Sequence, residues 1–212
     1  MEIVKYPKKE QWSELVKRPS LDVTSLFDTV RTVINDIKSR GDAAVCQYEE
    51  RFDHVAMSTL EVTAEEIEEA KMLVSPELQT AILNAKKNIS AFHSAQHFDG
   101  IKVETTPGVT CWQKSVPIEK VGLYIPGGTA PLFSTVLMLA VPAVIAGCQE
   151  IVLCTPPGRD GKVHPAVLFA ASVAGVHRIF RIGGIQAIAA MAFGTETVPK
   201  VYKLFGPGNQ YV

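Results

Sequence analysis

The carboxyl-terminal half of the chain alternates short apolar runs with longer apolar segments of helical length. Short strands that alternate with helices in this way are typical of a parallel β-sheet whose strands are joined by right-handed crossovers. We therefore expect an α/β fold built on a parallel sheet. The predicted strands cover residues 116–125, 150–154, 178–182 and 200–205, and the predicted helices cover residues 133–146, 165–174 and 185–193.

The first hundred residues have the apolar spacing of amphipathic helices instead. Apolar residues recur at three- and four-residue steps from Val23 to Ile37, and Gly41 follows as a helix end. Further helices are predicted over 42–52, from the capping-box sequence at 63–66 onward, and over 76–96. Two-residue alternation from Ile101 and the turn sequence TPGV at 106–109 predict a hairpin. We expect a mainly helical region over 1–100, then a hairpin and a parallel-sheet domain over 101–212.

The helices predicted in the second half are apolar on nearly every side. Residues 133–146 have only Ser134 and Thr135 as polar side chains, and residues 166–174 have only Ser172. A helix of this kind needs cover on both faces. The sheet covers one face, so the helical region, a further part of the chain or a partner subunit must cover the other. We therefore expect an oligomer.

Three glycine-bearing corners each follow a predicted strand: residues 124–128, 183–187 and 205–209. Glycine lets the backbone approach a ligand closely, and ligands of open α/β sheets bind at the carboxyl ends of the strands. Each corner also carries one side chain that can hold a ligand, namely Tyr124, Gln186 and Asn209. These three residues are the predicted binding site. The alternative, that the glycines only make tight turns, stays open on the residues alone.

Composition excludes several classes of function. A formal net charge of -1 and a pI near 6.5 do not fit a dedicated nucleic-acid binder. The one long apolar stretch, 132–148, is shorter than the roughly 20 residues that span a bilayer and contains Pro142. The amino terminus has no signal-peptide layout, and the four cysteines show no C-x-x-C spacing. We expect a cytoplasmic protein with reduced thiols, a small-molecule ligand and no membrane or nucleic-acid partner.

Common nucleotide and catalytic motifs are absent. The chain has no G-x-G-x-x-G, P-loop, G-x-S-x-G or H-E-x-x-H sequence. Backbone amides at 127–128 and 183–184 could bind phosphate where helices begin. Basic residues exceed acidic residues over 101–212, which suits a phosphate-bearing ligand but is equally compatible with a solvated surface.

Other candidate residues favour structural roles. His93 and His97 have the four-residue spacing of metal ligands, but no third ligand lies nearby in the sequence, so surface roles are favoured. Cys154 lacks an identifiable base, and a buried structural thiol is favoured over a nucleophile. Trp112 and Cys111 are expected to pack in the hairpin.

Several long motifs, in this order and spacing, resemble the histidinol dehydrogenase family. They are VGLYIPGG at 121–128, APLFST at 130–135, GGIQAIAA at 183–190 and FGPGN at 205–209, together with RGDA at 40–43 and PGV at 107–109. The resemblance covers essentially the whole chain. It implies a fold with incomplete Rossmann-like units, which would account for the missing dinucleotide fingerprint. It also implies that Tyr124, Gln186 and Asn209 contact NAD.

The resemblance implies an enzyme that oxidises L-histidinol to L-histidine through an aldehyde, in two steps that each pass a hydride to NAD. Zinc holds the substrate in this family, and the enzyme is a homodimer of histidine biosynthesis. The family's catalytic and zinc-binding residues would follow Val212, so we expect the chain to carry the cofactor side only and to be inactive alone. The alternatives are a non-catalytic nucleotide-binding module and a thiol enzyme that uses Cys148 or Cys154.

Overall fold

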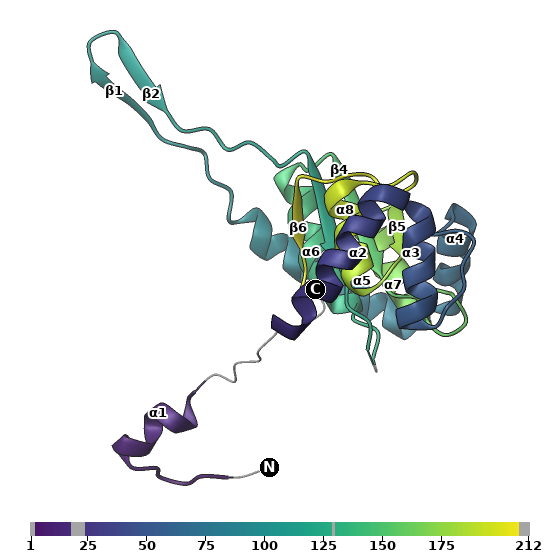
Figure 1. Cartoon of the computed structure of the whole chain (residues 1–212). Helices are drawn as coiled ribbons and strands as arrows, with labels where there is room; N and C mark the ends of the chain where they lie inside the picture. The colour runs from purple at the N-terminus through teal and green to yellow at the C-terminus, as the bar shows by residue number, and fades with distance from the viewer. Residues whose placement is uncertain (1–2, 18–23, 129, 208–212) are drawn as a thin grey trace.

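The computed structural model describes residues 3–17, 24–128 and 130–207 (Figure 1). Within these residues one parallel sheet forms the centre, with the strand order β5-β4-β3-β6. Its strands are β3 (Lys120–Tyr124), β4 (Glu150–Thr155), β5 (Arg178–Arg181) and β6 (Lys203–Phe205). The register pairs Leu123 with Leu153 and with Phe205, so the carboxyl ends of these strands lie at one edge. The predicted α/β fold with a parallel sheet is confirmed.

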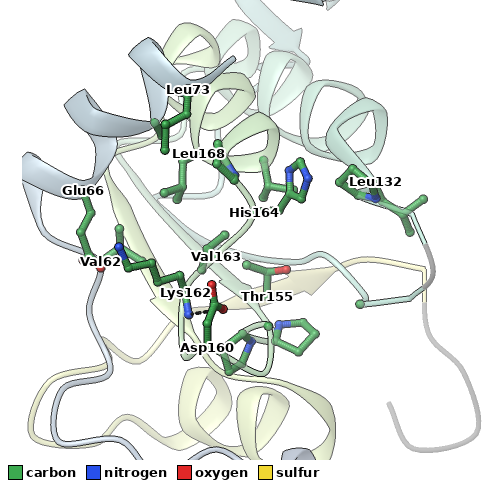
Figure 2. Close-up of a pocket in the computed structure, with 18 of the residues that line it drawn as sticks. Val62, Glu66, Leu73, Leu132, Thr155, Asp160, Lys162, Val163, His164 and Leu168 are labelled. Carbon is green, nitrogen blue, oxygen red and sulfur yellow. Dashed lines mark hydrogen bonds between the residues drawn. The ribbon is translucent and has the colours of Figure 1, made fainter. Parts of the chain in front are cut away.

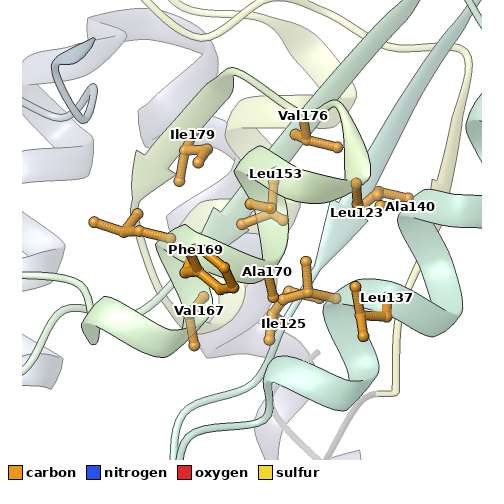
Figure 3. Packing of buried hydrophobic residues seen from close by; sticks show 14 of the residues in the cluster. Leu123, Ile125, Leu137, Ala140, Leu153, Val167, Phe169, Ala170, Val176 and Ile179 are labelled. Carbon is orange, nitrogen blue, oxygen red and sulfur yellow. The ribbon is translucent and has the colours of Figure 1, made fainter. Parts of the chain in front are cut away.

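Side chains of successive strand residues enter two separate hydrophobic cores, one on each face of the sheet. Leu123, Leu153 and Ile179 lie in the core that Figure 3 shows. Tyr124, Cys154 and Phe180 lie in the core on the opposite face. Because strand side chains alternate between faces, a sheet buried on both faces needs apolar residues at successive positions, and the central residues of β3, β4 and β5 provide them.

Helices cover both faces of the sheet. The three crossover helices are α6 (Phe133–Ala146), α7 (Pro165–Ala174) and α8 (Gly184–Phe193), close to the predicted ranges. α6 and α7 pack on the first face, and α8 packs on the second. Pro165 occupies the first turn of α7, and His164 caps that helix by accepting a hydrogen bond from the Ala166 amide at 3.1 Å.

The amino-terminal helices form an outer layer over the crossover helices. α4 (Ala64–Leu73) packs on α7, and α5 (Pro76–Ser94) packs on α6. α2 (Phe27–Arg40) and α3 (Asp42–Tyr48) pack on α8. A short helix, α1 (Trp12–Leu15), precedes them. The predicted capping box of α4 is present, since the Thr63 hydroxyl accepts from the Glu66 amide and the Glu66 carboxylate accepts from the Thr63 amide.

Two boundaries of these helices differ from the sequence-based expectation. α2 begins at Phe27 after a short 3-10 turn over Thr24–Leu26, and the predicted first residue, Val23, lies outside the described residues. The predicted helix over 42–52 changes after Tyr48 into a π-turn over Glu49–Asp53. π-turns within helices are frequent at functional sites, and this one faces the site described below.

The predicted hairpin is present, but its packing was predicted wrongly. β1 (Lys102–Thr106) and β2 (Val109–Trp112) pair antiparallel, and Gly108 at the turn has a φ of 84°. The hairpin extends away from the body (Figure 1), and all its strand residues are exposed. Trp112 is 70% exposed and Cys111 is exposed, contrary to the expectation that they pack in the hairpin. Two strands alone have no second layer to bury a side chain against.

The apolar crossover helices differ in how completely they are covered. α7 is buried along most of its length beneath α4 and against the sheet. α6 leaves Met138 61% exposed, with Val144 and Ile145 also exposed. Among the described helices, none combines the length and apolar character needed to cross a membrane.

Candidate functional site

A pocket of about 530 Å³ lies at the carboxyl ends of β3 and β4, beside the amino terminus of α8. Tyr124 and Gln186, which the sequence predicted as ligand contacts from two separate corners, both line it. Glycines of both corners line it as well, together with residues from the amino-terminal helices. The lining comprises Leu26, Thr29, Phe52, Asp53, Tyr124, Pro126, Gly127, Gly128, Pro156, Pro157, Gly184, Ile185 and Gln186.

The third predicted contact, Asn209, lies outside the described residues. Its strand, β6, pairs with β3, and Phe205 lies beside Leu123 in the register. The polypeptide therefore leaves the sheet at Phe205 next to the strand that carries Tyr124. Gly206 follows there, and a β-carbon at this position would lie only 2.5 Å from the Tyr124 carbonyl oxygen. The glycine is required because the two backbones approach so closely.

A hydrogen bond of Tyr124 joins the glycine corner that follows β3 (residues 124–128, the β3 corner) to the glycine corner at the start of α8 (residues 183–187, the α8 corner). Its hydroxyl accepts a hydrogen bond from the Gly184 amide at 3.0 Å. The side chain is buried, and this burial raises the pKa of the phenol above its usual value. Tyr124 therefore stays neutral and acts as a hydrogen-bonding group at the base of the pocket.

Gln186 is held from below by two acidic residues. Its Nε2 donates to Glu49 Oε1 at 2.7 Å and to Asp53 Oδ2 at 3.1 Å. Glu49 Oε1 also accepts from the Gly183 amide at 2.9 Å. The sequence suggested that the amides at 183–184 could bind phosphate, but Glu49 and Tyr124 already accept from both of them. An anion at this helix start would have to displace these side chains.

Burial controls the ionisation of the two carboxyl groups. Glu49 has no exposed surface, and this burial raises its pKa to about 8, despite the opposing hydrogen bond from the Gly183 amide. The nearby Asp53 adds to the increase. Burial also raises the pKa of Asp53. The pair was not predicted from the sequence, where the four-residue spacing of two acids at a helix end is the only available signal.

A second pocket, of about 520 Å³, borders the glycine corner that follows β3 and the segment that follows β4 (Figure 2). Gly127 and Gly128 line both pockets. Lys162, Asp160 and His164 line the second one, and the Lys162 amide donates to Asp160 Oδ1 at 3.1 Å. The predicted glycine corner therefore separates two hollows at the carboxyl edge of the sheet.

A buried ion pair fixes the edge of the second pocket. Arg181, at the end of β5, pairs with Glu66 at the start of α4 and donates to the Glu61 and Gly161 carbonyl oxygens at 3.1 and 3.3 Å. Burial opposes ionisation of Glu66, but Arg181 and Thr63 hold its pKa below the usual value. The pair joins the helical layer to the sheet.

The remaining candidate residues have structural partners. His93 is hydrogen-bonded to Gln96, and His97 pairs with Asp99. Within the described ranges, no group of three or more His, Cys, Asp or Glu residues is placed to hold a metal ion. Cys154 is fully buried, and burial strongly raises the pKa of its thiol. A thiol in this environment is a poor nucleophile, as the structural interpretation of Cys154 expected.

Comparison with known proteins gives a consistent result. The sequence profile of the histidinol dehydrogenase family matches residues 16–212. Histidinol dehydrogenase of Bacteroides thetaiotaomicron is 69% identical over the whole chain, which covers 50% of that protein. The Escherichia coli K12 protein of the same name is 50% identical over 96% of the chain, which covers 46% of that protein.

A solved structure agrees with these relatives. The crystal structure of histidinol dehydrogenase from Elizabethkingia anophelis superimposes with a TM-score of 0.92 at 49% sequence identity. The match covers 97% of this chain and 47% of that one. The chain thus spans about half the length of the relatives that it matches. The family profile, the sequence identities and the superposition show that this chain belongs to the histidinol dehydrogenase family.

Proposed function

We propose that this chain forms the NAD-binding side of an L-histidinol dehydrogenase. The whole protein would oxidise L-histidinol to L-histidine through an aldehyde, in two steps. The observation that carries the proposal is the convergence of Tyr124 and Gln186, 62 positions apart in the sequence, on one pocket at the carboxyl edge of the sheet. Family membership supports the reaction, and the position of the pocket supports the cofactor.

The chemistry of the pocket fits a dinucleotide. Phe52, Pro126 and Pro156 give it an apolar wall on which a planar ring can pack. At Gly128 an added β-carbon would meet nothing within 4 Å, so the backbone there is open to a ligand. When bound, NAD would accept the hydride. We propose that Tyr124, Gln186 and Asn209 orient it.

We propose that the zinc ligands and the catalytic base come from the part of the whole protein that this chain does not include. In this chain the described residues provide no cluster suited to a metal ion. We propose binding and orientation of the coenzyme as the roles of this half. We also propose a division into a helical region over 1–100 and an NAD-binding domain over 101–212, which the positions of α1–α5 and of the hairpin and parallel sheet in the chain support.

We also propose that the whole protein is a cytoplasmic homodimer. Met138, Val144 and Ile145 are exposed apolar side chains on the same helix, α6. They support the homodimer, because a group of exposed apolar side chains is typical of a surface that a partner covers. Sedimentation of the whole protein tests this: a dimer is expected, and a monomer at all concentrations would contradict it.

Steady-state kinetics of the whole protein test the cofactor assignment. We expect Gln186→Ala to raise the KM for NAD while the KM for histidinol stays near the wild-type value. Gln113→Ala, which changes an exposed glutamine beyond β2, is the matched control and should leave both constants unchanged. Equal increases in both KM values for Gln186→Ala would contradict a specific NAD contact. The 212-residue chain alone should form no NADH from histidinol, and turnover by it would overturn the division of roles.

A further inference from the structure

Two acids, the buried Glu49 and the half-buried Asp53, accept hydrogen bonds from the same amide group beside the candidate cofactor pocket. Glu49 and Asp53 lie at the two ends of one π-turn, and both accept a hydrogen bond from Nε2 of Gln186. Their carboxyl oxygens are therefore within two hydrogen-bond lengths of each other. Glu49 Oε2 and Gln186 Oε1 are buried and have no hydrogen-bond partner among the residues that the structure describes. Burial of a carboxyl group disfavours its charged form, so Glu49 is stabilised in the protonated, neutral form.

His54 is the basic group that acts on the pair, and it acts on Asp53, where it opposes the increase in pKa. The titratable groups that face the pair are Tyr124 of β3, Cys154 of β4, Cys46 of α3 and His54. Neither carboxyl group forms a salt bridge within the described part of the chain. Two like charges this close, one of them fully buried, cannot both be present without a large free-energy cost.

We propose that Glu49 and Asp53 share one proton at neutral pH and act as positioning residues, holding Gln186 and the α8 corner in the conformation that receives NAD. The identity of the ligand as NAD rests on the function proposed above. The shared proton does not depend on it. Glu49 acts through Gln186 and Gly183, and Asp53 also lines the pocket directly.

The hydrogen bonds explain how the pair would position the amide. Nε2 has two N–H groups, and each has a carboxyl acceptor, so the amide cannot rotate without losing both bonds. Loss of the shared proton would place a second negative charge under the pocket. That charge would repel the phosphates of NAD and favour opening of the corner. NAD affinity should therefore fall as pH rises, by up to about tenfold per pH unit for one linked proton.

Two variants distinguish the effect of the shared proton from that of the hydrogen bonds, and a third is the control. Glu49→Gln keeps a carbonyl oxygen that can accept from Gly183 and Gln186 but removes the titration. Asp53→Asn does the same for the partner. Glu50→Gln is the matched control, because Glu50 is exposed on the same π-turn. The side-chain ¹⁵N resonances of Gln186, recorded by NMR on the full chain from about pH 5.5 to 9.5, report directly on the amide.

We expect the Gln186 resonances to titrate in the wild type and in Glu50→Gln, and to stay constant in Glu49→Gln. NAD affinity, measured over the same pH range on the whole protein, should fall as pH rises in the wild type. In Glu49→Gln it should stay nearly constant. Constant wild-type resonances, or the same titration in Glu49→Gln, would overturn the shared proton. Titrating resonances with NAD affinity independent of pH would overturn the link to the cofactor.

One outcome distinguishes this inference from the proposed function. If Gln186 titrates as expected but NAD binds at no pH to any form of the protein, the proposed function fails and the shared-proton pair stands. The pH dependence of unfolding gives an independent check. The folded-state pKa of Glu49 lies above its unfolded value of 4.5. Glu49 therefore contributes stability that is fully present below pH 4.5 and is lost as pH rises through the folded-state pKa. Glu49→Gln should therefore gain stability relative to the wild type as pH rises, and a constant difference would contradict the pair.

Discussion

Replacing Tyr124 by Phe removes one hydroxyl group from the centre of the site. That hydroxyl is the acceptor for the Gly184 amide at 3.0 Å, and the ring around it is buried. The ring of Phe would still fill the same space. The variant therefore isolates the single hydrogen bond that joins the β3 corner to the α8 corner.

The expected loss of stability follows from the burial of the two partners. Leaving a buried donor without an acceptor costs about 1–3 kcal/mol. Gly184 is only partly buried, so water can reach its amide in some conformations, and we expect the lower part of this range, about 1–2 kcal/mol. For a domain of this size the midpoint of thermal unfolding falls by about 2–4 °C per kcal/mol. Tyr124→Phe should thus lower the Tm by roughly 2–8 °C.

Thermal and urea unfolding of the variant, compared with Tyr202→Phe, measure this loss. Tyr202 is 66% exposed, and its hydroxyl lies outside the site, so its replacement should change stability by less than about 0.5 kcal/mol. A Tyr124→Phe chain as stable as the wild type would show that the hydroxyl does not anchor the α8 corner. A Tyr202→Phe chain destabilised to the same degree would show that the effect is not specific to the pocket.

Four further variants test the fold by urea unfolding. Arg181→Ala should cost about 1–3 kcal/mol, because the half-buried Glu66 carboxylate loses its arginine partner while it keeps the Thr63 amide. Arg178→Ala, at a more exposed pair, should cost about 0–1 kcal/mol, and equal losses would contradict the role of burial. Gly122→Val should cost about 1–3 kcal/mol, since a β-carbon there would lie 2.6 Å from a neighbouring leucine methyl group, and a neutral result would count against this packing. Trp112→Ala should change stability by less than about 0.5 kcal/mol, and a larger loss would mean that the hairpin is packed.

The elements with local signals were predictable from the sequence. The capping box at 63–66, Pro76 at a helix start, the TPGV turn and the strand–helix alternation each follow from residues close together in the chain. The chemistry of caps, turns and periodicity acts over a few residues. Predicted and observed elements therefore differ mainly at their ends.

The contacts beneath the pocket were not predictable in the same way. Glu49 meets Gly183 across 134 positions of sequence, and Asp53 meets Gln186 across 133. No local rule places two acids under a glycine corner, because the contact depends on how α3 and its π-turn pack on α8. The exposure of Trp112 was missed for a related reason, since burial depends on a second layer that the sequence pattern of a hairpin does not reveal.

In the proposed function, the corners at Tyr124 and Gln186 hold the dinucleotide. A crystal structure of the whole protein with NAD bound tests this assignment most directly. We expect the coenzyme to lie in the pocket lined by these two side chains and by Gly127 and Gly128. A coenzyme bound away from both corners would contradict the account.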